Sequence, residues 1–362
     1  MKARIGVIGC GWWATRAHFP ALLANPDAEI VAIADTDDGN RHRAEQQIGL
    51  RSDRAFADAA QMLDEVELDG AVIAVPHAAH ASLARLILEH DLHLLLEKPM
   101  TIDPADARSL AELATARGRE LIIGYPWHYN RQVLAVRDAI ADGRIGSIEY
   151  VSCQFASIVR ELYRGNPEPY RDVLGYPVNP PGRDTYADPA IAGGGQGQTQ
   201  ITHSAALLFW LTGLRPTHVA AIGGSFELAV DLADAAAIRF GSGAVGSLGS
   251  TGSVLPGQDE LLEYRLFGSD GHILFDVNEG LASIHGHDGS VVRLPAPPIE
   301  ERYPDWAPTD NLVEVILGRG SNGSPPWIGV LTVEFVDAMY RSAREARTIT
   351  IAVDRKDSVG AT

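Results

Sequence analysis

The sequence predicts an α/β protein with an N-terminal, doubly wound parallel sheet and a C-terminal α+β domain on a large, open, mostly antiparallel sheet. Strand-like apolar runs alternate with helix-like segments through residues 4–125, which is typical of parallel sheets covered by helices on both faces. From about residue 147, strand-like runs follow one another and are separated by glycine-containing turns. The chain has 362 residues, which is too long for one ordinary core, so two domains are expected.

The first part of the chain contains apolar runs of strand length. A helix is expected between the apolar runs Ala71–Val75 and Leu92–Leu96, because Leu83, Leu86 and Ile87 share one helical face. A second helix is predicted to begin at Asp103, which caps it before a proline in the first helical position, and to end at Gly118. The predicted strands are Ile5–Ile8, Ile30–Ala34, Ala71–Val75, Leu92–Leu96 and Leu121–Ile123.

The second part begins with a predicted strand, Ile148–Phe155. The following segment, 163–195, is rich in Pro, Gly, Tyr and Arg and is too long for a simple connection, so we expect it to be functional. Helices are predicted at about 200–212 and at Glu334–Glu345. Further strands are expected near 217–223, 235–240, 244–250, 261–268, 271–277 and 280–285. The predicted domains are 1–125 and 126–353, with a flexible tail at 354–362.

Composition restricts the possible partners. The formal net charge is −17 and there is no block of Lys or Arg, so neither nucleic acid nor an anionic membrane is an expected partner. No apolar window is long enough to span a bilayer. Cys10 and Cys153 lie far apart without metal-site spacing, which favours a reducing, cytoplasmic location. The histidines between residues 77 and 93 also lack a metal-binding signature, so no metal site is predicted.

A glycine-rich turn follows the first predicted strand. Residues 9–14, Gly-Cys-Gly-Trp-Trp-Ala, have the G-x-G-x-x-A spacing of dinucleotide-binding turns. Gly9 permits the tight turn, Gly11 lets the backbone approach a pyrophosphate, and Ala14 lets the next helix pack close to the strand. The N-terminus of that helix would receive the negative charge of the phosphates.

The second predicted strand ends at Asp35. A carboxylate at this position can accept hydrogen bonds from the adenosine ribose, which favours NAD over NADP. Arg41 and Arg43 lie nearby and could tolerate a 2′-phosphate. The sequence therefore predicts NAD, with NADP as the less favoured cofactor.

The fourth predicted strand leads directly into Glu97 and Lys98. The carboxyl ends of strands in open parallel sheets are where ligands bind. A hydroxyl that is being oxidised must lose its proton as hydride leaves, and a desolvated lysine can accept that proton near neutral pH. Lys98 is therefore the candidate general base.

Several motifs accompany these features: Val75-Pro76 with His80 four residues on, Glu97-Lys98-Pro99, Gly124-Tyr125, and Gly193-Gly-Gly195 leading to His203. With the glycine-rich turn, they make the chain resemble the glucose–fructose oxidoreductase/inositol dehydrogenase (Gfo/Idh/MocA) family. The resemblance implies a Rossmann domain, a C-terminal sheet that forms a homodimer or homotetramer, and hydride transfer at a sugar, polyol or cyclitol carbinol.

The resemblance also assigns roles to single residues. Lys98 matches the family's catalytic lysine, and His203 matches its second catalytic residue. Many family members have Asp where this chain has Thr199, so His203 lacks the usual carboxylate and Lys98 is expected to carry more of the proton transfer. The expected cofactor-binding residues are Gly9, Gly11, Trp12, Trp13, Ala14, Asp35, Thr36, Pro76, His77, His80, Glu97 and Lys98.

Glutamines in the segment 193–200, with aromatic and Arg side chains elsewhere, suit a polyhydroxylated ligand, because amides both donate and accept hydrogen bonds. The arginines leave room for an acidic sugar. The long segment contributes Tyr163, Tyr170, Arg171, Tyr176, Arg183 and Tyr186. The expected substrate-binding residues are Lys98, Trp127, His128, Arg183, Tyr186, Gln198, Thr199, Gln200 and His203.

Three functions remain open from the sequence. The first is an NAD-dependent dehydrogenase that acts on a secondary hydroxyl of a sugar, glycoside, sugar acid or cyclitol. The second is a redox-neutral isomerase, lyase or glycosidase that keeps NAD tightly bound. The third is a non-catalytic dinucleotide or sugar sensor, because fold alone does not determine function.

Overall fold

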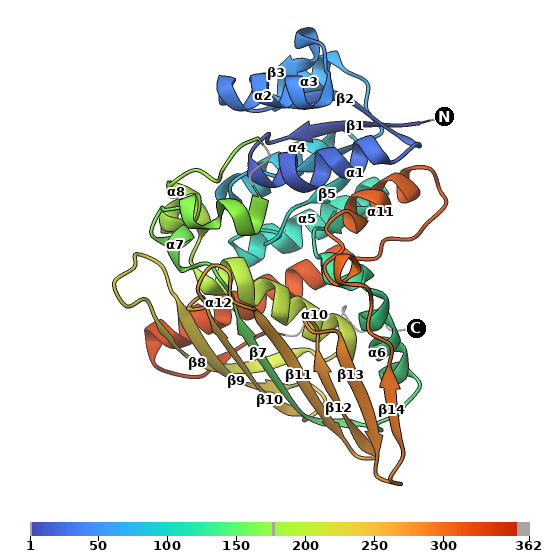
Figure 1. Ribbon diagram of the computed structural model, residues 1–362, viewed down its shortest axis with the longest axis vertical. Helices are drawn as coiled ribbons and strands as arrows, with labels where there is room; N and C mark the ends of the chain where they lie inside the picture. Colours follow the sequence, from blue (N-terminus) through green and yellow to red (C-terminus); the bar gives the residue numbers. More distant parts are fainter. Residues whose placement is uncertain (1, 176–177, 353–362) are drawn as a thin grey trace. The chain divides into compact units, whose positions relative to one another are not determined.

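The computed structural model describes residues 2–175 and 178–352, which form two compact units (Figure 1). The first unit joins the chain up to Pro126 with Arg164–Gly193 and Asp305–Val330. The second joins Trp127–Tyr163, Gly194–Pro304 and the described residues from Leu331. Segments 164–193 and 305–330, assigned from sequence to the second domain, therefore belong to the first unit. Tyr176 and the predicted tail lie outside the described residues.

The first unit is built on a sheet with strand order β3-β2-β1-β4-β5-β6. All neighbouring strands are parallel, and this is the order of the doubly wound dinucleotide-binding fold. In sequence order the unit contains β1 (Ala3–Ile8), α1 (Phe19–Ala24), β2 (Ala28–Ala34), α2 (Asp38–Ile48), β3 (Ala55–Phe56), α3 (Ala59–Glu65), β4 (Gly70–Ile73), α4 (His80–Glu89), β5 (His93–Leu96), α5 (Pro104–Arg117), β6 (Leu121–Ile123), α8 (Asp184–Ala187), α9 (Pro189–Ala192) and α11 (Ala307–Ile316).

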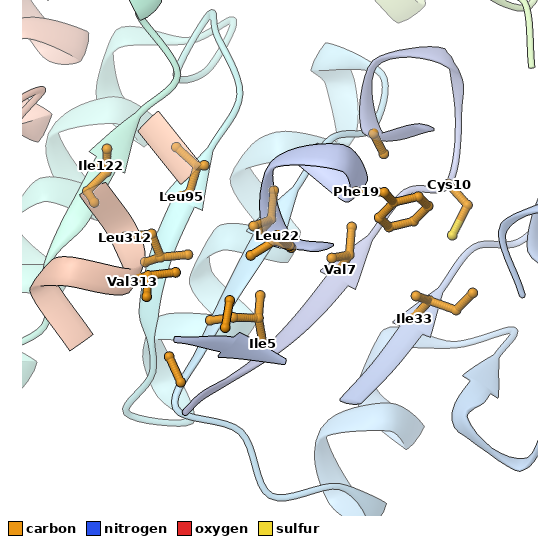
Figure 2. Close-up of a cluster of buried hydrophobic side chains, with 14 of the residues drawn as sticks. Ile5, Val7, Cys10, Phe19, Leu22, Ile33, Leu95, Ile122, Leu312 and Val313 are labelled. Atoms are coloured by element: carbon orange, nitrogen blue, oxygen red, sulfur yellow. The ribbon is translucent and has the colours of Figure 1, made fainter. Parts of the chain in front are cut away.

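The strands of this sheet are apolar because helices cover both of its faces. One buried cluster joins side chains from β1, β2, β5 and β6 to Leu312 and Val313 of α11, a helix from far down the chain (Figure 2). Gly70 in β4 allows the close approach of this helix, since a Cβ there would lie 2.7 Å from Cδ1 of Ile316. The predicted ends of α5 are confirmed: Asp103 accepts a hydrogen bond from Ala105 N at 2.7 Å, and Gly118 adopts φ 61°.

The second unit is built on a nine-stranded sheet with order β14-β13-β12-β11-β7-β10-β9-β8-β15. β7 and β10 pair in parallel, and the other neighbouring strands pair antiparallel. The unit contains α6 (Arg131–Ala141), β7 (Ile148–Ala156), α7 (Arg160–Tyr163), α10 (Thr202–Thr212), β8 (Pro216–Gly224), β9 (Ala233–Phe240), β10 (Val245–Thr251), β11 (Leu261–Gly268), β12 (Gly271–Asp276), β13 (Leu281–Gly286), β14 (Val291–Leu294), most of α12 (Pro326–Glu345) and β15 (Ile349–Thr350).

Burial alternates along the strands of this sheet, which is the pattern of a sheet with one covered face. In β9, for example, Ala236, Ile238 and Phe240 are buried and the residues between them are exposed. Helix α10 lies against the covered face, where it contacts β7 (Figure 1). The opposite face presents small side chains such as Ala235 and Ala237 together with charged ones such as Glu263 and Arg265.

The predicted fold class is confirmed, although some elements differ from the predictions. The strand predicted at Ala71–Val75 ends at Ile73, and the helix predicted at Glu334–Glu345 begins at Pro326. The elements without an individual prediction include β3, β14, β15, α6 and α11. β3 and β15 have two residues each and are defined by pairing, not by local sequence. Among the described residues, no helix has both the length and the apolarity needed to cross a bilayer.

Candidate active site

The glycine-rich turn connects β1 to the helix that leads into α1. Gly9 has φ 90°, and a Cβ there would lie 2.2 Å from the carbonyl oxygen of Ala74, so only glycine fits. Gly11 differs, because no atom lies within 4 Å of a Cβ built on it. Ala14 is fully buried, which allows the helix to pack closely. The turn therefore presents open backbone at Gly11, as a pyrophosphate requires.

Asp35 follows β2 and supports this turn. Its Oδ2 accepts a hydrogen bond from Cys10 N at 2.7 Å, and its Oδ1 accepts one from Asp37 N at 2.8 Å. Each carboxylate oxygen can accept a further hydrogen bond, so a ribose hydroxyl can still be bound. Thr36 beside it is exposed. Arg41 donates to the carbonyl oxygen of Asp35 at 2.6 Å and to the carboxylate of Asp38. These two contacts fix the position of its guanidinium beside Asp35.

The long segment 164–193 contacts the glycine-rich turn through Asn179. This buried amide donates to the carbonyl oxygen of Cys10 at 2.8 Å and accepts a hydrogen bond from Nε of Arg43. Arg183 is exposed and lines a hollow of about 340 Å³ together with Asn40 and Arg43. The structure thus places Arg183 beside α2.

Glu97 links the end of β5 to the helix that follows the glycine-rich turn. Its Oε1 accepts hydrogen bonds from Trp13 Nε1 at 2.8 Å and from His18 Nε2 at 3.0 Å. Nδ1 of His18 lies 2.8 Å from the hydroxyl of Thr309. Burial opposes ionisation, but the hydrogen bonds and nearby positive charge outweigh it, so the pKa of Glu97 falls below its usual value. Gly124 makes room for this carboxylate, since a Cβ there would lie 2.8 Å from Oε1.

Lys98 stands at the carboxyl end of β5 and is half-buried. Its backbone N–H donates to Oε2 of Glu97 at 3.2 Å, so the carboxylate orients the chain at this point. Burial lowers the pKa of the Lys98 ammonium, and the charge of Glu97 offsets only part of that shift. The amine therefore loses a proton more readily than an exposed lysine, as a general base requires.

Two histidines support the neighbouring strand ends. His80 is fully buried, with Nδ1 2.8 Å from the carbonyl oxygen of Pro99 and Nε2 3.0 Å from that of Val75. Both of its nitrogens thus contact backbone, which joins the chain after β4 to the chain after β5. His77, next to Pro76, lies 2.8 Å from the carbonyl oxygen of Ala192, and burial together with nearby positive charge lowers its pKa to about 3.

Tyr186 packs edge-on against His77, with ring centroids 6.3 Å apart. This contact places a predicted substrate residue beside the strand ends that carry Pro76 and His77. The residues of the first unit therefore fit a dinucleotide: Gly11 opens onto free space and Asp35 directly follows β2. Among the described residues, no three His, Cys, Asp or Glu side chains are grouped to hold a metal ion.

His203 lies in the second unit within an aromatic cluster. Its ring centroid is 5.5 Å from that of Trp127 and 6.4 Å from that of Tyr303. Trp127 and Tyr303 also meet edge-on at 5.0 Å, and Phe155 of β7 lies behind Trp127 at 6.0 Å. Aromatic faces of this kind can pack on the C–H surfaces of a sugar ring.

Thr199, four residues before His203, is part of a buried polar network. Its hydroxyl donates to the carbonyl oxygen of Gly195 at 2.9 Å and forms a hydrogen bond with the hydroxyl of Tyr163. The Tyr163 oxygen also lies 3.1 Å from Oε1 of Gln196, and Nε2 of Gln196 donates to the hydroxyl of Ser250 at 2.8 Å. Thr199 therefore anchors the segment before α10. Gln198 is buried in the same turn, and Gln200 is half-buried.

His128 is buried against α10. Its ring stacks on Trp210 with centroids 4.8 Å apart, and Arg137 lies over the same indole at 4.0 Å. Burial and the charge of Arg137 lower the pKa of His128 to about 3. This packing supports a structural role for His128, and the structure adds nothing in favour of a substrate contact.

Sequence reasoning missed three residues that contact predicted site residues or the glycine-rich turn within their own unit: His18, Asn179 and Tyr303. A π-helical turn, Ala14–His18, places Trp13 and His18 on the same carboxylate. In an α-helix, side chains five residues apart point in different directions. The helical periodicity of the sequence therefore did not indicate that His18 joins Trp13 at Glu97. Asn179 and Tyr303 lie in irregular segments and act through contacts distant in sequence.

Comparison with known proteins identifies both parts of the chain. Residues 3–125 match the model of the oxidoreductase family with the NAD-binding Rossmann fold, and residues 133–274 match the Gfo/Idh/MocA C-terminal domain. A dTDP-3,4-didehydro-2,6-dideoxy-α-D-glucose 3-reductase of Streptomyces violaceoruber is 34% identical over 152 residues, 42% of this chain and 44% of the relative. D-apiose dehydrogenase of Paraburkholderia graminis is 31% identical over 161 residues, 44% of this chain and 42% of that relative.

The alignments thus span less than half the length of these two relatives. Over the whole chain, the fold is similar to that of a levoglucosan dehydrogenase solved with NADH and levoglucosan. The TM-score is 0.81 at 18% identity, with 98% of this chain and 100% of the other covered. The chain belongs to the Gfo/Idh/MocA family of oxidoreductases, with an NAD-binding Rossmann domain followed by the family's C-terminal domain.

Proposed function

We propose that this protein is an NAD-dependent dehydrogenase that oxidises a secondary hydroxyl of a sugar, glycoside, sugar acid or cyclitol. The observation that carries the proposal is Lys98, an amine with a lowered pKa at the carboxyl end of β5 in a dinucleotide-binding sheet. The names of the relatives, a keto-sugar reductase and an apiose dehydrogenase, support hydride transfer at a sugar carbon.

NAD, held at the open backbone of Gly11 and at Asp35, would supply the hydride acceptor for the carbinol carbon. Lys98 in its neutral form accepts the proton of the hydroxyl, and it returns that proton when the reaction runs towards reduction. His203 assists by hydrogen-bonding the reacting hydroxyl. Since Thr199 is occupied by Tyr163 and Gly195, no carboxylate at that position raises the basicity of His203, and the proton transfer falls mainly to Lys98.

The aromatic cluster around His203 supports a carbohydrate ligand. The rings of Trp127 and Tyr303 lie next to the imidazole. Gln198 and Gln200 flank Thr199 in the turn before α10. We propose Tyr303 as a substrate-contacting residue in addition to Trp127, Tyr186 and Arg183.

The experiment is a screen of polyols, glycosides and sugar acids with NAD and NADP in parallel, followed at 340 nm. Lys98→Met should lower turnover of the best substrate roughly 10²- to 10⁴-fold, the usual contribution of general base catalysis, and should leave the Kd for NAD nearly unchanged. Lys2→Met is the matched control, because Lys2 is exposed and lies just before β1. Unchanged turnover in Lys98→Met would overturn the assignment.

One observation favours a second function, a redox-neutral reaction with retained NAD. Asn179 joins the segment 164–193 to Cys10 within the glycine-rich turn and to Arg43 of α2, which can slow cofactor release. Protein purified without added cofactor should then carry about one NAD per chain and form no net NADH during turnover. Protein that is purified free of NAD, or that accumulates NADH, favours the dehydrogenase.

We also propose that the open face of the nine-stranded sheet joins copies of the chain into a homodimer or homotetramer. Phe267, Leu274 and Leu281 are exposed on this face, and small side chains of β9 and β10 leave a shallow hollow of about 920 Å³. A sheet face with exposed apolar residues is typical of a protein interface. Light scattering should show the mass of two or four chains. Leu274→Arg should lower this mass, because it places a charge on the proposed interface.

A further inference from the structure

Glycines dominate the segment that precedes the His203 helix, and two neighbouring residues explain why. A Cβ on Gly194 would lie 2.3 Å from the hydroxyl of Tyr340, and one on Gly197 would lie 2.4 Å from it. A Cβ on Gly195 would lie 2.0 Å from the carbonyl oxygen of Asp231. Such distances exclude any side chain, so the segment is built around Asp231 and Tyr340.

The same two residues accept the hydrogen bonds of the segment's backbone. Asp231 Oδ1 accepts from Gly195 N at 2.8 Å, and its Oδ2 accepts from Gly197 N at 2.7 Å. The backbone oxygen of Asp231 accepts from Gln196 N at 2.9 Å. The Tyr340 hydroxyl accepts from Gln198 N at 3.2 Å and donates to Oδ1 of Asp231 at 2.9 Å.

Four consecutive N–H groups are therefore bound by groups outside the helix, at a helix start where N–H groups have no partner in the helix itself. A carboxylate at this end also interacts favourably with the helix dipole. The segment continues into the π-helical turn Gly197–Ile201 and then α10, which carry Gln198, Thr199 and His203. Asp231 and Tyr340 come from distant parts of the chain, just before β9 and from α12.

We infer that Asp231 and Tyr340 are positioning residues, which hold the segment 194–198 in one conformation and so fix Gln198, Thr199 and His203 for the substrate. This inference rests on the proposed function, because it assigns substrate binding to the helix that they hold. Neither residue needs to touch the substrate. Removing either should loosen the segment and weaken catalysis while the Rossmann sheet keeps its affinity for NAD.

The test compares full-length Tyr340→Phe and Asp231→Asn with the wild type. Tyr340→Phe keeps the ring and removes the hydroxyl. In the wild type, Gly195 N and Gly197 N donate to the two carboxylate oxygens of Asp231. Asp231→Asn replaces one of these oxygens with an NH₂ group, which cannot accept the hydrogen bond. Ser342→Ala is the matched control, because Ser342 lies on the same helix and its buried hydroxyl bonds Ala221 N at 2.9 Å and the carbonyl oxygen of Arg347 at 2.7 Å, away from the glycine segment.

Hydrogen exchange of the substrate-free protein is the first measurement. Amides of residues 195–198 should exchange roughly fivefold to tenfold faster in Tyr340→Phe, the size of one net hydrogen-bond contribution, and should be unchanged in Ser342→Ala. The second measurement is kinetic: kcat/KM for the substrate found in the screen should fall at least fivefold, and the Kd for NAD should stay within about twofold, because the hydroxyl lies outside the dinucleotide turn.

Unchanged exchange in Tyr340→Phe would overturn the inference, and so would faster exchange with unchanged kcat/KM. Tyr340→Phe alone decides the matter if Asp231→Asn does not fold. A wild-type protein that oxidises nothing in the screen would overturn the proposed function instead. The exchange measurement would still show whether these two residues hold the segment, because it needs no substrate.

Discussion

At the scale of single residues, two opposing influences set the chemistry of Lys98. Burial favours the neutral amine, whereas the charge of Glu97 favours the ammonium, and burial has the larger effect. Glu97 is itself held by Trp13 and His18, so its position beside Lys98 is fixed by the helix that follows the glycine-rich turn. The cofactor turn and the candidate base thus share one hydrogen-bonded network.

This balance predicts a titration that can be observed directly. Lys2, Lys98 and Lys356 are the lysines of the chain, so ¹³Cε-lysine labelling yields an NMR spectrum simple enough to assign with Lys98→Met. The Lys98 signal should titrate below the usual lysine pKa of about 10.4. kcat/KM should rise with pH through the same Lys98 pKa, because the neutral amine is the base.

Glu97→Gln tests the direction in which Glu97 shifts the pKa of Lys98. The substitution removes a negative charge that stabilises the ammonium, so the pKa of Lys98 should fall further and the acidic limb of kcat/KM should move to lower pH. His42→Gln, an exposed histidine on α2, should leave both unchanged. A Lys98 pKa that rises in Glu97→Gln would contradict the account.

At the scale of elements, the sequence predicted regular structure well and local irregularity poorly. The glycine-rich turn and the strand ending in Glu97-Lys98 have local patterns, and both lie where they were expected. The π-helical turns at Ala14–His18 and Gly197–Ile201 have none, because their geometry depends on tertiary partners such as Glu97 and Asp231. His18 was missed for that reason.

Asp234, at the start of β9, carries a pH-dependent part of the stability. Its Oδ2 is buried and makes no hydrogen bond within the described protein. Burial and the adjacent Asp231 carboxylate raise the pKa of Asp234 to about 9. An unfolded Asp titrates near pH 4, so between about pH 4 and 9 the folded protein binds a proton that the unfolded chain does not. Stability should therefore fall as pH rises through this window.

Asp234→Asn tests this prediction, since an amide keeps the shape and cannot ionise. The free energy of unfolding of the wild type should fall by up to about 1.4 kcal/mol per pH unit relative to the variant across the window. Urea unfolding at pH 5 and pH 8.5 measures the difference. Asp288→Asn is the control, because Asp288 lies in an exposed turn after β13. Parallel pH profiles for the wild type and Asp234→Asn would contradict the raised pKa.

At the scale of the whole molecule, chain order and structural units do not coincide. The sequence suggested a break near residue 125, and the sheet of the first unit does end there. That unit nevertheless includes 164–193, with Asn179 on the glycine-rich turn, and 305–330, with α11 on the sheet. Local patterns cannot show that a segment returns to an earlier sheet, because the return depends on which apolar face remains uncovered after the nearby helices have packed.

The returning helix predicts that the first 126 residues do not form a stable domain alone. Without α11, the side chains of Ile5, Leu95 and Ile122 lose their contacts with Leu312 and Val313, and burial of such side chains contributes about 1.5–3 kcal/mol each. Fragment 1–126 should bind a hydrophobic dye and unfold without a cooperative transition. The same fragment linked to 305–330 should recover cooperativity and NAD binding, whereas a linked segment carrying Leu312→Asp and Val313→Asp should not. Cooperative unfolding of fragment 1–126 alone would show that α11 is dispensable for the sheet.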